Sequence, residues 1–156
     1  MSKNRILYTE VKDMIIIRIE GKGSWVESKP FLDFAETQLK KGKKIVVDLS
    51  DCELLDSTFL GTLAYLSLNY SGIEISSPGK EVKRAITTLG LTKILRETKI
   101  KIPEEKGKEL EKHKLSPEER AKILMKAHRT LISIEPANLP QFKDLLELVE
   151  KENEKE

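Results

Sequence analysis

The chain has 156 residues, of which 38% are hydrophobic and 35% are charged. A length of this order fits one domain with room for an appendage. The 28 basic and 26 acidic residues nearly cancel to a net charge of +2, which argues against a dedicated nucleic-acid-binding protein, because such proteins usually carry a basic stripe. No apolar run approaches the length of a membrane span, and the first residues lack the apolar core of a signal peptide. We therefore expect a soluble, cytoplasmic protein.

The N-terminal part of the chain predicts a strand hairpin followed by a helix. Residues 6–11 and 14–20 predict two strands, the second of them a β-branched run. Residues 21–24, with two glycines and a serine, predict a turn that ends the second strand. Pro30 then predicts the start of a helix, which Gly42 ends.

The middle of the chain continues the alternation of strands and helices. Residues 43–50 predict a strand buried on both faces, because its Ile-Val-Val centre is continuous. The elements expected after it are a helix over 58–70, a strand over 73–76, a helix after Pro78 and Gly79, and a fifth strand over 99–102. This order predicts an α/β fold, a mixed sheet of four to five strands with helices packed against it.

The C-terminal part predicts two more helices. Ser116 followed by Pro117 and Glu119 is typical of a helix start, with an N-cap, a proline in the first turn and a capping box. We expect a helical hairpin over 116–135 and 138–151, whose apolar faces must bury against each other, the sheet domain or a second chain. The chain thus divides into a domain over 1–103, a charged linker over 104–115 and a two-helix extension over 116–156, with charged residues 151–156 frayed.

The turn that follows the buried strand is the main candidate site. It reads Asp-Ser-Thr-Phe-Leu-Gly over residues 56–61 and places Ser57 where a helix begins. Backbone N–H groups at a helix N-terminus lack intrahelical partners and carry partial positive charge, so they can hold a phosphate. Two interpretations follow from the residues alone: Ser57 is an N-cap, or it is a phosphoserine switch.

Residues 49–61, which contain this turn, resemble the signature of the STAS domain, shared by sulfate transporters and anti-sigma factor antagonists. The family pattern is a strand, a short loop and then Asp-Ser-Ser/Thr-x-Leu-Gly. Residues 75–78, 82–84 and 89–95 are similar to the last strand-and-helix segment of the family, with its glycine break. The resemblance covers about residues 5–100 and leaves the two C-terminal helices outside.

The resemblance implies a regulatory binding protein. Bacterial members of this family bind an anti-sigma factor that is also a serine kinase, and the unphosphorylated form frees the sigma factor. The kinase phosphorylates the serine in the motif and breaks the complex, and a PP2C-type phosphatase restores the active form. By position the acceptor is Ser57.

The neighbours of Ser57 are expected to contact the partner. Asp56 is interpreted as a cap or as a group that orients the hydroxyl, and Thr58 as a packing or capping residue of the first turn. Phe59 is interpreted either as an exposed partner anchor or as a core residue. Gly61 allows the close approach of a neighbouring element or of a partner.

Two departures from the family pattern favour an alternative function. Phe59 stands where many members have glycine, and Ser24 replaces an acidic residue that often lies near the acceptor. Trp25, the only tryptophan, is a contact residue or is partly buried against the first helix. The alternative is a non-switching STAS subunit of a stress-signalling scaffold or a lipid-transport assembly.

The sequence offers little for an enzyme. His113 and His128 are the only histidines, both lie in the C-terminal part, and helical histidines of this kind are usually solvated or packing residues. We find no glycine-rich phosphate loop, metal cluster or nucleophile–base pairing, so we expect no catalysis, no metal and no cofactor. Cys52 has no intramolecular partner and is expected to be a small buried residue. A homodimer through the C-terminal helices is an open expectation.

Overall fold

A mixed sheet forms the centre of the computed structural model, which describes residues 4–104 and 107–154. Its strands are β1 (Arg5–Val11), β2 (Met14–Gly23), β3 (Lys44–Asp48), β4 (Cys52–Leu55), β5 (Ile73–Ser76) and β6 (Lys108–Glu109). The order is β5-β3-β2-β1-β6, with β4 paired to the end of β2. β1 and β2 form the expected antiparallel hairpin, whereas β2–β3 and β3–β5 are parallel. The mixed sheet is confirmed, but it has six strands where four to five were expected.

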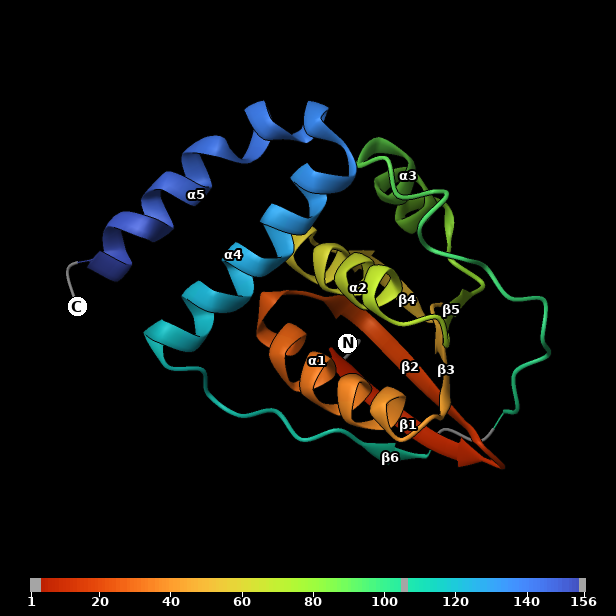
Figure 1. The fold of residues 1–156 in the computed structure, drawn as a ribbon. Helices are drawn as coiled ribbons and strands as arrows, with labels where there is room; N and C mark the ends of the chain where they lie inside the picture. Colours follow the sequence, from red (N-terminus) through yellow and green to blue (C-terminus); the bar gives the residue numbers. More distant parts are fainter. Residues whose placement is uncertain (1–3, 105–106, 155–156) are drawn as a thin grey trace.

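Helices α1 (Trp25–Lys40) and α2 (Ser57–Asn69) cover one face of the sheet (Figure 1). α1 connects the parallel neighbours β2 and β3, and the crossover from β3 to its parallel neighbour β5 contains β4 and α2. The helix α3 (Lys80–Thr88) follows β5. The core between sheet and helices is mainly apolar; its fully buried members include Ile17, Phe31, Phe59 and Leu63.

The predicted turn over residues 21–24 is wrong, because β2 continues to Gly23 and pairs in parallel with β4. A side chain at Gly23 would place its Cβ 2.6 Å from Cδ2 of Leu55, so the Leu55 side chain would have to shift to admit one. The strand expected over 99–102 is also wrong. That segment has no strand, and only an isolated bridge between Ile75 and Glu97 precedes it.

The first helix begins at Trp25, five residues before the proline that was expected to open it. Ser24 and Glu27 explain the earlier start, since they form a reciprocal capping box at the helix N-terminus. Pro30 therefore lies inside α1, where it is fully accommodated as a buried residue. The helix start is thus fixed by the capping box of Ser24 and Glu27 and not by Pro30.

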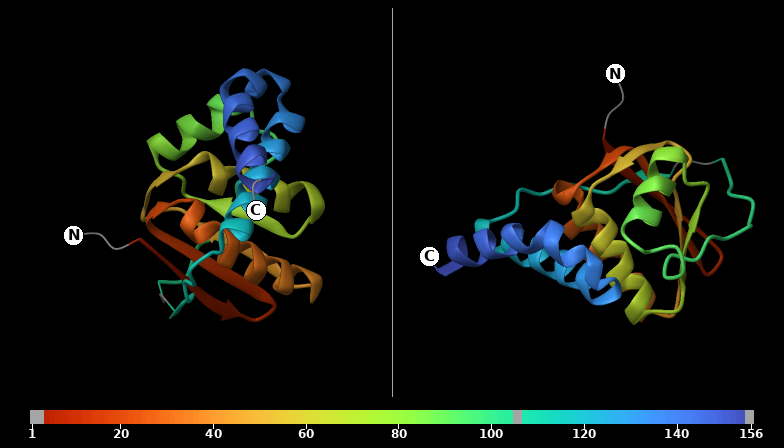
Figure 2. Two further views of the ribbon diagram at one scale, coloured as in Figure 1. Left: turned by 90° about the vertical axis from the view of Figure 1, so that its left-hand side faces the viewer. Right: turned by 90° about the horizontal axis from the view of Figure 1, so that it is seen from above.

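The C-terminal extension consists of α4 (Pro117–Ile134), a short 3-10 turn (Pro136–Asn138) and α5 (Leu139–Glu154). The capping box at Ser116 is confirmed. α4 contacts both α2 and α1, and α5 folds back along α4 and extends beyond the rest of the molecule (Figures 1 and 2). Within the described part of the chain, no helix combines the length and apolarity that a bilayer crossing would need.

The segment predicted as a charged linker contributes a strand to the sheet. Two of its residues, Lys108 and Glu109, form β6 and pair antiparallel with Leu7 and Tyr8 of β1. Residues 105–106 of the linker, and 155–156 of the end predicted to be frayed, lie outside the described residues. Helix α5 continues through residues 151–154 of that predicted frayed end.

Candidate functional site

Asp56, and not Ser57, caps helix α2. Oδ1 of Asp56 accepts the backbone N–H of Phe59 at 2.8 Å, and Asp56 has extended backbone angles, as an N-cap requires. Ser57 is the first residue of the helix. The interpretation of Ser57 as the N-cap is therefore wrong, while the capping role of Asp56 is confirmed. The Ser57 hydroxyl is left available for another partner.

The second carboxylate oxygen of Asp56 holds the start of α1. Oδ2 accepts the backbone N–H of Trp25 at 2.9 Å. One side chain thus serves donors at the N-termini of two helices, where the helix dipoles favour a negative charge. Burial raises the pKa of Asp56, and the hydrogen bonds from Phe59 and Trp25 act in the opposite direction.

The Ser57 hydroxyl is hydrogen-bonded to a histidine of the C-terminal extension. Oγ of Ser57 lies 2.8 Å from Nε2 of His128, and Nδ1 of His128 lies 2.7 Å from the carbonyl oxygen of Leu124. A carbonyl only accepts, so Nδ1 carries the proton, Nε2 is the acceptor, and Ser57 donates. The His128 side chain is fully buried beside the ring of Phe142, and burial lowers its pKa, which keeps the imidazole neutral.

Helices α2 and α4 are in backbone contact next to this hydrogen bond. A Cβ added at Gly61 would lie 2.4 Å from the carbonyl oxygen of Ala127. Real Cβ atoms do not approach an oxygen so closely, so only glycine permits this packing. The expectation that Gly61 allows a close approach is confirmed, and the approaching element is α4.

Phe59 is a core residue and not an exposed anchor. Its side chain is fully buried, and its ring centroid lies 4.9 Å from that of Phe31 on α1. Thr58 is also buried, and its carbonyl accepts the hydroxyl of Thr62. Because both side chains are enclosed by the protein itself, the prediction that Phe59 contacts a partner is wrong and Thr58 is a packing residue.

Ser24 and Trp25 lie at the start of α1, beside the Ser57 turn. The Ser24 hydroxyl accepts the N–H of Val26 within the capping box. Trp25 is 37% exposed, and the guanidinium of Arg120 lies 5.9 Å from its ring centroid. Trp25 therefore lies against α4, a neighbour that neither earlier interpretation of this residue included.

The sequence interpretation missed His128. It predicted no nucleophile–base pairing, yet the structure pairs Ser57 with His128. Leu124, Ala127 and Leu131 place His128 on the apolar stripe of α4, and this spacing indicated burial. The pair differs from a catalytic triad because a backbone carbonyl, and not a carboxylate, holds Nδ1.

Two other acidic and thiol groups near the turn have structural roles. Asp48 accepts the N–H of Ser50, and its carboxylate lies 3.8 Å from Nε of Arg18. Cys52 is buried, as expected, and burial raises its pKa to about 11. Among the residues that the structure describes, no group of three His, Cys, Asp or Glu side chains is placed to hold a metal ion.

A comparison with protein families assigns the chain to a family. The family model described as "Mlab, STAS domain" matches residues 7–97. The chain belongs to the STAS domain family. α4 and α5 lie beyond the matched residues. A comparison with curated protein sequences found no match.

Several solved structures share the STAS fold of this chain. TM1081 of Thermotoga maritima, provisionally assigned as an anti-sigma factor antagonist, is 26% identical, with a TM-score of 0.54, covering 59% of this chain and 84% of its own. An anti-sigma factor antagonist of Mycobacterium paratuberculosis is 19% identical, with a TM-score of 0.54 and coverage of 64% and 87%. The Bacillus antagonist SpoIIAA in its unphosphorylated form is 14% identical, with a TM-score of 0.53 and coverage of 60% and 87%.

Proposed function

We propose that this STAS protein is an anti-sigma factor antagonist that is switched off by phosphorylation of Ser57. In this scheme the unphosphorylated chain binds an anti-sigma factor that is a serine kinase, and a PP2C-type phosphatase reverses the modification. The observation that carries the proposal is the placement of Ser57 as the first residue of α2, with its cap supplied by Asp56. The hydroxyl is therefore not used by its own helix.

The chemistry of the step is a phosphoryl transfer to the hydroxyl of Ser57. The kinase would transfer the terminal phosphoryl group of ATP to Oγ of Ser57. A bond from Oγ to phosphorus forms, the bond to ADP breaks, and the hydroxyl proton passes to a base of the kinase. The product carries a charge of about −1.5 to −2 at a helix N-terminus, where the dipole favours it.

The surroundings explain why such a charge would disrupt binding. Asp51, Glu53 and Asp56 lie close in sequence to Ser57 and repel the phosphate. A partner pressed against the turn would have to bury an unpaired charge, which costs several kcal/mol, and about 2.8 kcal/mol is already a hundredfold in affinity. The expected result is a large loss of binding without unfolding of the sheet domain.

Phosphorylation in vitro tests this proposal. The serine-kinase anti-sigma factors encoded in the genome of the source organism would each be incubated with the full chain and ATP, followed by intact-mass and peptide mass spectrometry. We expect one phosphoryl group on Ser57 and none on the Ser57→Ala variant, with Thr58→Ala as the matched control. Absence of phosphate at Ser57 with every kinase contradicts the switch.

A non-switching STAS subunit is the second candidate. The hydrogen bond from the Ser57 hydroxyl to buried His128 favours this candidate, since it gives Ser57 a structural role that needs no phosphorylation. The use of Ser24 in a capping box, where an acidic residue was expected, points the same way. Affinity purification that recovers scaffold or lipid-transport subunits, and no kinase, would support this candidate.

A further inference from the structure

We infer that helix α4 is an internal cap on the Ser57 turn, so that a kinase or a protein partner reaches Ser57 only after α4 leaves α2. The inference rests on the proposed function for the role of Ser57 in binding. The contact between α4 and α2 does not depend on that function. Three separate contacts carry the inference.

The first contact is the hydrogen bond between Ser57 and His128. Oγ of Ser57 donates its one proton to Nε2 at 2.8 Å, and a phosphoryl group in place of that proton removes the donor. The imidazole is fully buried and lies edge-on to Phe142. A phosphate at Ser57 therefore replaces this hydrogen bond with a charged group against the acceptor nitrogen of a buried, neutral imidazole, so phosphorylation of Ser57 opposes the docking of α4.

The second contact closes the surface of α2 to other proteins. The carbonyl oxygen of Ala127 stands 2.4 Å from the position that a Cβ of Gly61 would take. Ala127 and Gly61 are both buried. Because the two backbones touch, a side chain of another protein has no room at this point of α2 while α4 is docked.

The third contact holds the far end of α4. Nδ2 of buried Asn138 donates to the carbonyl oxygens of Leu89 and Leu131, both at 3.0 Å. These two bonds tie the last turn of α4 to the end of α3. Since they lie away from the Ser57 turn, they allow α4 to be loosened without altering the surface of α2.

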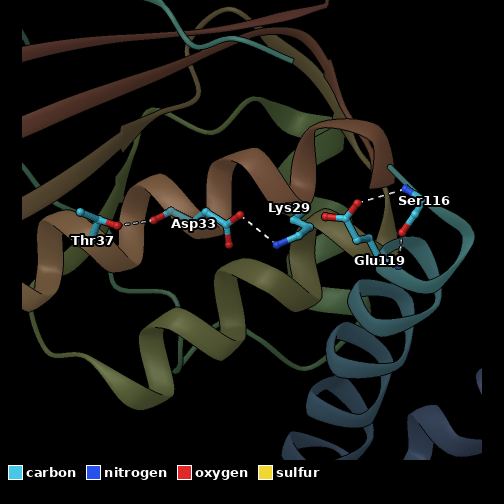
Figure 3. A network of polar contacts seen from close by, with 5 residues as sticks. All are labelled: Lys29, Asp33, Thr37, Ser116 and Glu119. Atoms are coloured by element: carbon cyan, nitrogen blue, oxygen red, sulfur yellow. Dashed lines mark hydrogen bonds and ion pairs between the residues drawn. The ribbon is translucent and has the colours of Figure 1, made fainter. Parts of the chain in front are cut away.

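The start of α4 lies beside α1. Glu119 lies beside Lys29 of α1, and the ion pair of Lys29 is with Asp33 of the same helix, at 2.9 Å (Figure 3). The Lys29–Asp33 pair is partly exposed to solvent, and exposed ion pairs contribute little to stability. Trp25, whose ring lies 5.9 Å from the guanidinium of Arg120, reports on this end of the cap through its fluorescence.

The STAS core is separable from the cap. The family match ends at residue 97, and TM1081 is aligned over 84% of its own length by 59% of this chain. The family pattern therefore does not include the segment that forms α4 here. Release of α4 is then a local opening of the chain and not its unfolding.

Two substitutions in the full chain test the cap from opposite sides. Gly61→Ala strengthens α2, because alanine is favoured over glycine inside a helix, yet its Cβ collides with Ala127. Asn138→Ala removes the bonds at the far end and leaves α2 untouched. Ser67→Ala on α2 and Lys122→Ala on α4 are the matched controls, since Lys122 is exposed and Ser67 lies near the other end of α2.

The readout is the modification rate of a thiol at position 57, in the double variant Cys52→Ala, Ser57→Cys. The reagent is a maleimide carrying a long polyethylene glycol chain, which is too large to enter beneath α4. We expect slow modification in this double variant. Adding Gly61→Ala or Asn138→Ala to it should increase the rate at least tenfold. Hydrogen exchange of residues 121–131 should accelerate in the same two variants, while exchange of β2 and β3 is unchanged. The controls should leave both rates unchanged.

The outcomes separate this inference from the proposed function. The inference that α4 caps Ser57 is overturned if the thiol of the double variant reacts as fast as it does in urea. It is also overturned if neither Gly61→Ala nor Asn138→Ala changes the rate. A kinase that phosphorylates parent and Gly61→Ala chains at equal rates also overturns it, although the switch then stands. If the variants unmask the thiol and no kinase acts on either chain, the cap stands and the phosphoswitch fails.

Discussion

Asp56 accepts the backbone N–H of Trp25 at 2.9 Å, across 31 residues of sequence. The same carboxylate accepts the N–H of Phe59 at 2.8 Å. The start of α1 and the start of α2 are thus joined by one side chain, directly beside Ser57. The position of the candidate acceptor depends on this bridge.

Replacing Asp56 by alanine should lower the free energy of unfolding, because it leaves two helix N-termini without their cap. Loss of one cap costs about 0.5–2 kcal/mol, and here two donors lose their acceptor. Asp56→Asn keeps one acceptor oxygen and should cost less. Urea unfolding of the three chains measures the difference, and equal midpoints would show that the bridge does not stabilise the fold.

His128 should make stability depend on pH. Burial lowers its pKa in the folded chain below the ordinary value of 6.5. As pH falls below 6.5, the unfolded chain binds a proton before the folded one does, so the free energy of unfolding decreases toward the folded pKa. Above about pH 7 this contribution is constant.

The variant His128→Gln isolates this effect, because the buried carboxyls of Asp56 and Glu27, whose pKa values burial raises, are present in both chains. Their raised pKa values act with the opposite sign, stabilising the fold at low pH and losing that contribution as pH rises through them. Thermal unfolding between pH 5 and 8 should show a steeper decline for the parent. Parallel curves would mean that His128 does not titrate as argued.

Cys52 should be almost inert in the folded protein. Its pKa of about 11 leaves roughly a thousandth of the thiol ionised at pH 8, and the thiolate is the reactive form. An aromatic disulfide reagent should react slowly until urea unfolds the chain, after which the rate should rise steeply. Fast reaction without denaturant would contradict the buried placement of Cys52.

Phe59→Ala should destabilise the protein strongly, since a fully buried aromatic side chain is lost from its contact with Phe31. The expected cost is about 3–5 kcal/mol, and Phe59→Leu should cost clearly less. Chemical unfolding measures both. A surface anchor would behave differently: its loss would leave the unfolding midpoint unchanged.

The sequence predicted the elements whose signals are local. The β-branched run of β2, the capping box at Ser116 and the strand-turn-helix order around Ser57 all depend on neighbours in the chain. The start of α1 was missed because Ser24 was assigned to a turn and the capping box that it forms with Glu27 was not considered. The strand β4 was missed because four residues beside a turn become a strand only by pairing with the end of β2.

The site needed tertiary structure to be understood. The motif located Ser57 and the glycine signalled a close approach, but neither identified what approaches. His128 is distant in sequence, and the apolar stripe of α4 indicated burial without indicating which surface it buries against. The pairing of Ser57 with His128 is a property of how α4 packs on α2.

The two-residue strand β6 limits how far α4 can move from α2 when it is released. Lys108 and Glu109 fasten the connection to the sheet edge, so only the short segment 110–116 separates that attachment from α4. A detached α4 then remains close to α2, at a local concentration on the order of millimolar for a short tether. Dilution of the protein does not change this local concentration. An external protein that binds α2 must therefore compete with a helix that stays tethered beside it.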